Sequence, residues 1–259
     1  TFLNYKMEVH FTDPDGETIV VPGYFAADGD AGESGADSGT VWRVHLLPLK
    51  PGEWSYRVSF LEGENIAIAT GNAKGSSLAF DGEQGTFTVT PADTSQAGFL
   101  GKGKLQYIGE HFLQFTNGEY FFKMGANAPE VLLQYKDFDG TDSERTYQKH
   151  IADWEEGDLL WHKDKGKGIV GVVNYLKKQG INSHYFLLMS AYGDGKTAFP
   201  WVGQDDYYQY DVSKLDQWQG LFDYMMQEGM MVQFVLSEQE NQSYFEFKER
   251  NSRLRNSKK

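Results

Sequence analysis

The sequence contains no cysteine. This absence excludes a disulfide framework, a thiolate metal site and a cysteine nucleophile. The six histidines form no H-x-x-x-H or H-E-x-x-H spacing, and no G-x-S-x-G motif occurs. The chain therefore offers neither the histidine pair of a zinc protease nor the nucleophile elbow of a serine hydrolase. We predict no metal ligands and no cofactor, and we expect His184, which lies within an apolar stretch, to be a core residue.

Positive charge is scarce relative to negative charge. Lysine and arginine together number 24 against 37 aspartates and glutamates, so the formal net charge is -13. A polyanion such as nucleic acid would be repelled by most of this surface, and no nucleic-acid partner is expected. Neutral partners, including many sugars, are compatible with this charge.

Long hydrophobic runs are also missing. No run approaches the roughly 20 residues that a transmembrane helix needs, and no basic-then-apolar leader opens the chain. We therefore expect no membrane span and no leader within this chain.

One stretch begins like a calcium-binding loop. Asp137, Asp139 and Asp142 have suitable side chains, but Gln148 stands at the twelfth position, where a bidentate glutamate belongs. This spacing excludes an EF-hand and leaves only a loose structural calcium site open.

The first third of the chain alternates between apolar and polar residues. Tyr5 to Thr12 alternates strictly, and Asp13-Pro14-Asp15-Gly16 supplies turn residues before the next apolar stretch. The same alternation recurs in later segments around Trp42, Trp54 and Phe87. Short strands at this spacing are typical of an antiparallel sandwich, so residues 1–92 are predicted to form an all-β Ig-like domain.

A polar linker at 93–104 is predicted to separate this domain from a different pattern. Asn117-Gly118 between two aromatic stretches predicts a β-hairpin at 112–122. Ile169, Val172, Val173 and Leu176 then follow helical spacing with Gly180 just beyond, and Asp211 is placed to cap a second helix. Apolar strands at 183–189 and 230–236 follow these helices, which predicts parallel βαβ units.

The glycines at 166, 168 and 171 match the G-x-G-x-x-G pattern of dinucleotide-binding loops. No strand precedes them, because the residues before are Trp161-His162-Lys163-Asp164-Lys165. We therefore predict that these glycines allow close packing of the helix rather than phosphate binding.

Several stretches carry a resemblance to a known family. They are Val21 to Gly29 (VPGYFAADG), Pro51 to Tyr56 (PGEWSY), Lys123 to Glu130 (KMGANAPE), Asp137 to Thr141 (DFDGT) and Asp211 to Trp218 (DVSKLDQW). Over about residues 2–241 the chain resembles a bacterial glycoside hydrolase family in which an N-terminal Ig-like domain of unknown function precedes a (β/α)8 barrel. The resemblance implies a secreted or periplasmic enzyme that degrades a polysaccharide.

The resemblance also implies a TIM-type barrel of the large retaining glycosidase clan. In that clan an acid/base glutamate follows strand four and a nucleophilic glutamate follows strand seven. Only about three barrel strands are predicted within 105–246, starting near Phe121, Ser183 and Met230, so the barrel is expected to be incomplete. No catalytic residue is therefore expected in this chain, which should be inactive alone.

The last residues, 247–259, are basic and predicted to be a disordered tail, consistent with a truncation or a reading-frame error. The alternative hypotheses are a noncatalytic carbohydrate-binding module and a structural or interaction protein.

Acidic and aromatic residues gather where the predicted parallel strands end, which is where barrel active sites are built. Carboxylates accept hydrogen bonds from sugar hydroxyls, and aromatic rings stack on sugar faces. Solvated loop carboxylates and packed aromatics are the competing interpretation. The residues predicted to bind a polysaccharide or oligosaccharide are Asn127, Glu130, Asp137, Asp139, Asp194, Trp201, Glu238, Glu240 and Asn241.

Overall fold

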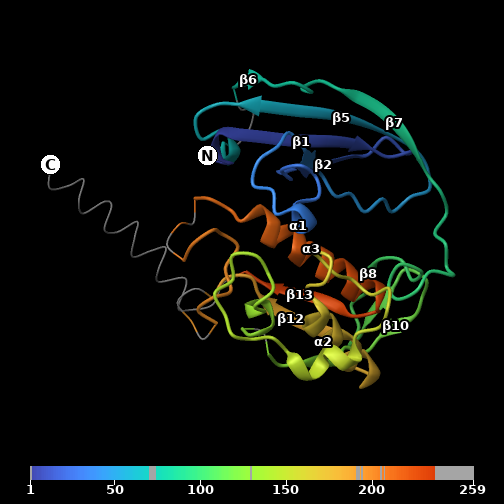
Figure 1. Cartoon of the computed structure of the whole chain (residues 1–259). Coiled ribbons are helices and arrows are strands. Elements are labelled where there is room, and N and C mark those ends of the chain that lie inside the picture. The colour runs from blue at the N-terminus through green and yellow to red at the C-terminus, as the bar shows by residue number, and fades with distance from the viewer. Residues whose placement is uncertain are drawn as a thin grey trace, which may run out of the picture. The chain divides into compact units, whose positions relative to one another are not determined.

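The computed structural model describes residues 2–69, 74–128, 130–190, 193, 195–204, 206 and 208–236. Short strands are the main elements of the described chain, and helices are few (Figure 1). The chain divides into two compact units. Unit 1 comprises Thr1–Ala31 and Ala36–Ser95, and unit 2 comprises Gly32–Gly35 and Gln96–Lys259. The boundary after Ser95 falls inside the predicted linker at 93–104.

Unit 1 is built on one antiparallel sheet of five strands. Its order is β2-β1-β5-β6, and β7 also pairs with β5. The strands are β1 (Tyr5–Thr12), β2 (Thr18–Pro22), β5 (Gly52–Glu62), β6 (Ser76–Ser77) and β7 (Gln84–Val89). A second, two-stranded antiparallel sheet pairs β3 (Tyr24–Phe25) with β4 (Trp42–Arg43). Two 3-10 helices, η1 (Phe2–Asn4) and η2 (Ile66–Ile68), complete the regular elements of unit 1.

Alternation along the strands produces the core of unit 1. In β1 the side chains of Met7, Val9 and Phe11 are buried, as the alternation predicts. In β5 the buried positions are Trp54, Val58 and Phe60, and they join the β1 side chains in one apolar cluster. Because successive side chains in a strand point to opposite faces, the residues between them form an outward polar face.

The turn between β1 and β2 is held by its own aspartate. The Asp13 carboxylate accepts hydrogen bonds from the backbone amides of Asp15 at 2.9 Å and Glu17 at 2.8 Å. Gly16 adopts a φ of 87°, a conformation that glycine enters without steric penalty. The predicted turn is confirmed.

One strand is shorter than its alternation predicts. β4 ends at Arg43, yet Val44 and Leu46 still pack against the core of unit 1 without strand pairing. Pro48 and Pro51 follow closely, and proline has no N–H group to extend a strand ladder. Val44 and Leu46 thus keep their apolar packing but form no strand hydrogen bonds.

Unit 2 begins with a three-stranded antiparallel sheet. Its strands are β8 (Leu105–Tyr107), β9 (Leu113–Phe115) and β10 (Tyr120–Phe121). The predicted Asn-Gly hairpin joins β9 to β10, and Gly118 has a φ of 93°. Phe115 and Phe121 pack edge-on against each other and against Phe99. The hairpin prediction is confirmed.

Three parallel strands follow, in the order β11-β12-β13. They are β11 (Gly125–Ala126), β12 (Ser183–Leu187) and β13 (Met231–Val235). Helix α2 (Lys167–Lys178) lies between β11 and β12 in the chain, and helix α3 (Val212–Gln227) lies between β12 and β13. The parallel pairing therefore agrees with the predicted βαβ pattern.

The first parallel strand starts later than predicted. It begins at Gly125 rather than near Phe121, because Phe121 pairs with Leu113 in the antiparallel hairpin and is buried against Phe115. The hairpin therefore contains Tyr120–Phe121, and the parallel sheet begins only at Gly125.

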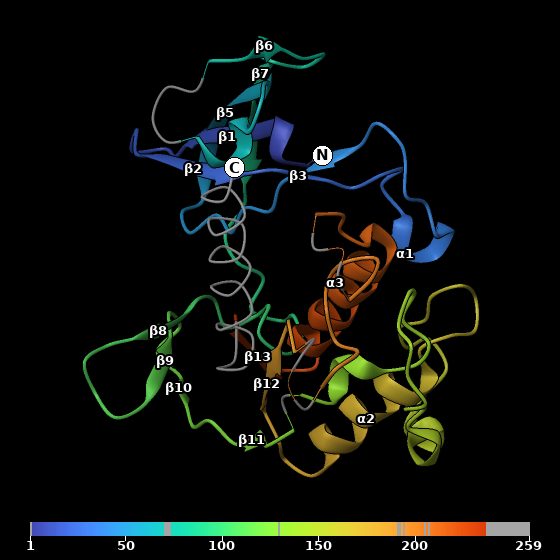
Figure 2. The ribbon, with the colours of Figure 1, turned by 90° about the vertical axis from the view of Figure 1, so that its left-hand side faces the viewer.

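Both long helices lie on the same side of the parallel sheet (Figure 2). Ile169 and Val173 of α2 and Trp218 and Leu221 of α3 share one apolar cluster with Phe186 of β12. The remaining short helices among the described residues are α1 (Ala31–Ser34), η3 (Leu132–Gln134) and η4 (Gln148–Asp153). None of the helices in the described residues combines the length and apolarity needed to cross a bilayer.

Each long helix ends in the same way. At the end of α2, the amide of Gly180 donates to the carbonyl of Lys177 and the amide of Ile181 donates to that of Leu176. At the end of α3, Gly229 and Met230 repeat this pattern. Both glycines have φ near 75° to 78°, so these are Schellman caps.

The glycines at the start of α2 serve close packing, as predicted. A Cβ on Gly171 would lie 1.8 Å from the His150 carbonyl oxygen, and one on Gly168 would lie 2.2 Å from that of Thr146. No side chain larger than hydrogen fits at either position. The backbone of α2 therefore approaches η4 and the segment before it directly.

Candidate functional site

The parallel sheet has one face that the helices do not cover. Phe186 and Phe234 point toward α3, where both contact Phe222. Tyr185 of β12 and Gln233 of β13 are cross-strand partners on the opposite face because side chains alternate along a strand. Asn127 follows β11 on that same face, and we call Asn127, Tyr185 and Gln233 the polar sheet face.

Hydrogen bonds connect the members of this face to their surroundings. The Tyr185 hydroxyl donates to Oδ1 of Asn127, and Nζ of Lys123 donates to Oε1 of Gln233. Asn127 and Gln233 are exposed, and Tyr185 is half-buried. Amide, phenol and ammonium groups offer both donors and acceptors, which suits hydrogen bonding to sugar hydroxyls. These side chains include no carboxyl group, so they cannot supply the acid and base of glycoside hydrolysis.

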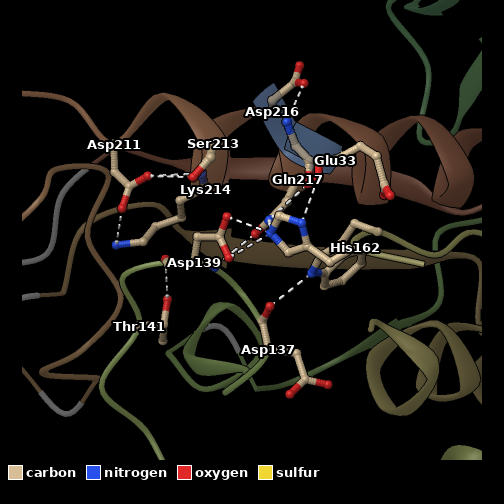
Figure 3. Close-up of polar contacts among 12 residues, drawn as sticks. Glu33, Asp137, Asp139, Thr141, His162, Asp211, Ser213, Lys214, Asp216 and Gln217 are labelled. Carbon is tan, nitrogen blue, oxygen red and sulfur yellow. Dashed lines mark hydrogen bonds and ion pairs between the residues drawn. The ribbon is translucent and has the colours of Figure 1, made fainter. Parts of the chain in front are cut away.

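A second polar cluster lies around His162, within unit 2 (Figure 3). The Nε2 atom of His162 lies 2.9 Å and 3.0 Å from the two carboxylate oxygens of Asp139. Its Nδ1 atom lies 2.6 Å from the carbonyl oxygen of Glu33. Gln217 of α3 joins the cluster by accepting from the Asp139 amide and donating to the Gly32 carbonyl.

This geometry favours the doubly protonated form of His162. Both ring nitrogens face acceptors, so both must carry a proton to hydrogen bond. The hydrogen bond that His162 donates to the Asp139 carboxylate accordingly raises the pKa of His162, with burial acting in the opposite direction. An imidazolium has no lone pair, so in this state His162 can neither accept a proton nor bind a metal ion. We interpret the cluster as a clasp that binds the Gly32–Gly35 segment to the loop at Asp139.

The backbone at His162 is strained in a way that matches this role. Its φ is 47°, in the left-handed region, and that of the next residue, Lys163, is 72°. A residue other than glycine pays about 1 kcal/mol or more for this conformation. Contacts on both sides of the ring hold His162 there.

Lys214 lies at the start of α3 beside this cluster (Figure 3). Asp211 caps α3 by accepting from the Lys214 amide, which confirms the predicted helix start. The Lys214 side chain is fully buried, and its Nζ donates to the carbonyl oxygens of Gly140, Phe199 and Trp201 at 3.1 to 3.4 Å. Burial lowers the pKa of Lys214, and the nearby Asp211 carboxylate opposes that effect. With Nζ enclosed by backbone carbonyls, Lys214 joins the β11–α2 loop to the β12–α3 loop and has no access to a substrate.

Among the predicted binding residues, Asp137 and Asp139 have partners within the protein. The Asp137 carboxylate accepts from the Tyr135 hydroxyl at 2.7 Å, and its carbonyl accepts from the Trp161 indole at 2.8 Å. Asp139 belongs to the His162 clasp. Both residues thus support the loop between β11 and α2, and their contact with a sugar stays a prediction.

Three other predicted residues are described, and the rest are not. Asn127 lies on the polar sheet face, the Glu130 carbonyl accepts from Gln134 at 2.6 Å, and Trp201 is 5% exposed and stacks on Phe199. The ring of Trp201 therefore packs inside unit 2. Asp194, Glu238, Glu240 and Asn241 lie outside the described residues.

Sequence reasoning missed Tyr185 and Gln233 as site residues. A signal for them exists, because alternation within each apolar strand places Tyr185 and Gln233 on the face opposite the phenylalanine that points toward α3. It missed His162 and Lys214 for a different reason. Their partners are remote in the chain, up to 129 residues away for His162 and Glu33.

Metal binding finds no support in the described residues. No group of three histidine or carboxylate side chains within the described ranges could hold an ion. His184 is 1% exposed and lies against Phe186, as expected for a core residue, and burial lowers its pKa.

Comparison with known proteins gives one match. A family described as a domain of unknown function, DUF5060, matches residues 2–61, which lie in unit 1 except for Gly32–Gly35. No curated protein and no solved structure matches the chain. Unit 1 is thus similar over β1 to β5 to a domain family whose description names no activity.

Proposed function

We propose that this chain is part of a glycoside hydrolase that acts on a polysaccharide. Unit 1 is then an accessory Ig-like sandwich, and residues 105–246 contribute the first βα units of a (β/α)8 barrel. The order β11-α2-β12-α3-β13 with parallel pairing supports this proposal, because it is the repeating unit of such barrels.

The polar sheet face is the observation on which the proposal rests. In a closed barrel, helices cover the outside of the sheet and the opposite face points inward. Asn127, Tyr185 and Gln233 occupy that opposite face, which by the same alternation also carries the apolar side chains of Leu187, Met231 and Val235. We infer that Asn127 and Tyr185, near the carboxyl ends of their strands, bind substrate hydroxyls.

Catalysis is assigned to glutamates outside this chain. Neither the polar sheet face nor the His162 clasp offers a pair of carboxyl groups on opposite sides of a cleft, which glycoside hydrolysis requires. The chain alone should therefore release no reducing sugar from any polysaccharide, and detectable hydrolysis would contradict this.

The first test is genetic. We expect the downstream coding sequence, read in all three frames, to encode further βα units and a glutamate at the end of the fourth strand. A downstream sequence without βα units in any frame would contradict the proposal.

The second test uses the complete enzyme of which this chain would be a part. Tyr185→Phe removes one hydroxyl and should raise KM for the polysaccharide by about tenfold, as expected for a lost hydrogen bond to substrate. Tyr107→Phe is the matched control, since Tyr107 lies in β8 and is 73% exposed. Equal KM values for the two variants would show that the polar sheet face does not bind substrate.

A further inference from the structure

The outward face of the antiparallel sheet in unit 1 contains a groove with a volume of about 880 Å³. The residues that line it come from strands β1, β5 and β7 and from Thr18 at the start of β2. This volume lies in the range of ligand-binding clefts, roughly 300 to 1,000 Å³. Nothing in the proposed barrel chemistry uses it.

The side chains in the groove form two rows across the strands. In one row His10 of β1 pairs with Arg57 of β5, and Arg57 pairs with Gln84 of β7. In the other row Thr12 pairs with Ser55, and Ser55 pairs with Thr86. The rows are two residues apart along each strand, or about 7 Å.

The charge of the groove differs from that of the protein. The eleven lining residues include one arginine and no aspartate or glutamate, although the whole chain carries 37 acidic residues and a net charge of -13. Among the described residues, no hydrogen bond or ion pair holds the Arg57 guanidinium. Asp81 is close enough to feel its charge, but that carboxylate is bound to the Ser77 hydroxyl and the Phe60 amide. Arg57 therefore keeps its donors for a ligand.

The groove also lacks an aromatic platform. Tyr56 is the only aromatic residue in the lining, and its ring packs into the core of unit 1 and against Gly85. Binding by stacking on a sugar face is thus disfavoured. The groove instead presents a guanidinium fork, an imidazole, an amide and several hydroxyl groups.

We propose that this groove binds a carboxylate-bearing polysaccharide, that is, a chain containing uronic acid. Arg57 binds the sugar carboxylate through paired hydrogen bonds, the geometry that guanidinium and carboxylate favour. The hydroxyls of Thr12, Ser55 and Thr86 bind ring hydroxyls. The spacing between the two rows is comparable with one pyranose ring, from its C5 carboxylate to its C2 and C3 hydroxyls. The choice of a sugar as ligand rests on the proposed function.

The net negative charge of the protein does not oppose this binding within the groove. At physiological ionic strength the Debye length is about 8 Å, so acidic residues elsewhere on the surface are largely screened. Within the lining Arg57 is the one permanently charged side chain, while Glu8 and Glu53 flank the two rows two residues further along their strands, and Glu8 is paired with Lys6 at 3.2 Å. Binding should therefore weaken as salt is raised, because a charged pair is involved.

The test is isothermal titration of the full chain with oligogalacturonate, alongside a neutral xylo-oligosaccharide of the same length. We expect the acidic oligosaccharide to bind with a Kd of about 1 mM or tighter, and the neutral one at least about tenfold more weakly. Arg57→Ala should weaken oligogalacturonate binding by about tenfold or more, as expected for a lost charged hydrogen bond. Lys74→Ala, which removes one positive charge from an exposed position of unit 1 outside the groove, should leave binding unchanged.

Ser55→Ala provides a second variant that keeps the charge of the groove and should weaken binding several-fold. Equal affinity of wild type and Arg57→Ala for oligogalacturonate would overturn the inference. Equal affinity of the wild type for the neutral xylo-oligosaccharide, or a higher affinity for a sulfated oligosaccharide than for oligogalacturonate, would also overturn it. Absence of any binding by a folded chain would also overturn it.

The outcome is separable from that of the proposed function. If the complete enzyme hydrolyses a polysaccharide while the groove binds no oligogalacturonate, only this inference fails. If the groove binds but the complete protein has no hydrolase activity, only the proposed hydrolase function fails.

Discussion

Lys50 in unit 1 and Lys214 in unit 2 each collect several oxygen atoms around one ammonium group. Lys50 lies 2.5 Å from Asp13, 2.8 Å from Asp15 and 3.2 Å from Glu17, with 38% of its side chain exposed. Lys214 is fully buried, and three of its partners are backbone carbonyls. The pKa of Lys50 is raised by hydrogen bonds to carboxylates, first to Asp13, whereas burial lowers the pKa of Lys214.

The difference shows that burial, more than the number of partners, decides what a charged contact does. Water solvates Lys50 when its partners are removed, so an exposed pair contributes little net stability. Water cannot replace Lys214 in the same way. If its ammonium group is removed, the buried carbonyls and the Asp211 carboxylate stay unpaired in surroundings of low polarity. The exposed contacts of unit 1 should therefore tolerate mutation, and the buried contacts of unit 2 should not.

Lys214→Ala should have the largest effect. It leaves three carbonyls and the Asp211 carboxylate without their cation, and we expect the free energy of unfolding of unit 2 to fall by about 3 to 5 kcal/mol. Amide hydrogen exchange in α3, compared with exchange in β1, measures the loss in unit 2 separately from unit 1. A loss in the free energy of unfolding of unit 2 below about 1 kcal/mol would contradict the conclusion that burial decides the effect.

Gly171→Ala tests burial at a position without charge. The added Cβ would lie 1.8 Å from the His150 carbonyl oxygen, and we expect a loss of about 3 kcal/mol from overpacking. Gly82→Ala in unit 1 is the control, because its φ is 83° but nothing lies within 4 Å of the new Cβ. That control should cost about 1 kcal/mol, from backbone strain alone. Thermal unfolding of both variants, followed by circular dichroism, gives the two values; equal losses would contradict the argument.

His162→Gln should show the pH dependence of the clasp. The folded pKa of His162 is raised by Asp139, so its stabilisation is fully present below about pH 6.5 and is lost as pH rises through the folded pKa. The variant should thus lose about 1 kcal/mol at acidic pH and less at alkaline pH.

His184 supplies the opposite sign for comparison. Burial lowers its pKa, so below about pH 6.5 the unfolded chain binds a proton at His184 more readily than the folded chain does. The protein therefore loses stability as pH falls from about 6.5 to the folded pKa. Urea unfolding of wild type and His162→Gln across this pH range separates the contributions of His162 and His184, because both proteins retain His184. A difference between them that grows toward alkaline pH would contradict the clasp.

Lys50→Ala should have the smallest effect. The Lys50 ammonium and its partners Asp15 and Glu17 are exposed, whereas the Asp13 carboxylate is 4% exposed, and we expect a loss of stability well below that of Lys214→Ala, reduced further by salt. The Asp13 carboxylate keeps its two backbone donors in the variant, so the turn should persist. A loss in unit 1 as large as that of Lys214→Ala in unit 2 would show that burial is not the deciding factor.

Local patterns in the sequence predicted many elements of both units. Alternation identified β1 and β5, Asn117-Gly118 identified the hairpin, and Asp211 and Gly180 identified helix ends. The prediction was wrong where two segments compete for one role, as at Phe121, whose apolar run was assigned to the parallel sheet. Its packing against Phe115 and Phe99 decided otherwise, and no local pattern encodes that contact.

The candidate site was less accessible from sequence. Asn127 was predicted, but its partner Tyr185 was not, because their proximity depends on the register of β11 with β12. Asp139 was predicted as a sugar ligand, and the structure shows it bound to His162. A carboxylate in a loop has the same local signature whether it faces a ligand or another side chain.

The sequence by itself determined where strands, turns and helix caps occur, because these depend on alternation, on backbone preference and on side chains a few residues apart. Only the tertiary structure decided which lysine of the described residues is buried, which histidine has acceptors at both ring nitrogens and which arginine lines the groove with no hydrogen bond or ion pair to the described residues. Each of those properties is set by groups that are distant in the chain and meet only when the whole unit has packed.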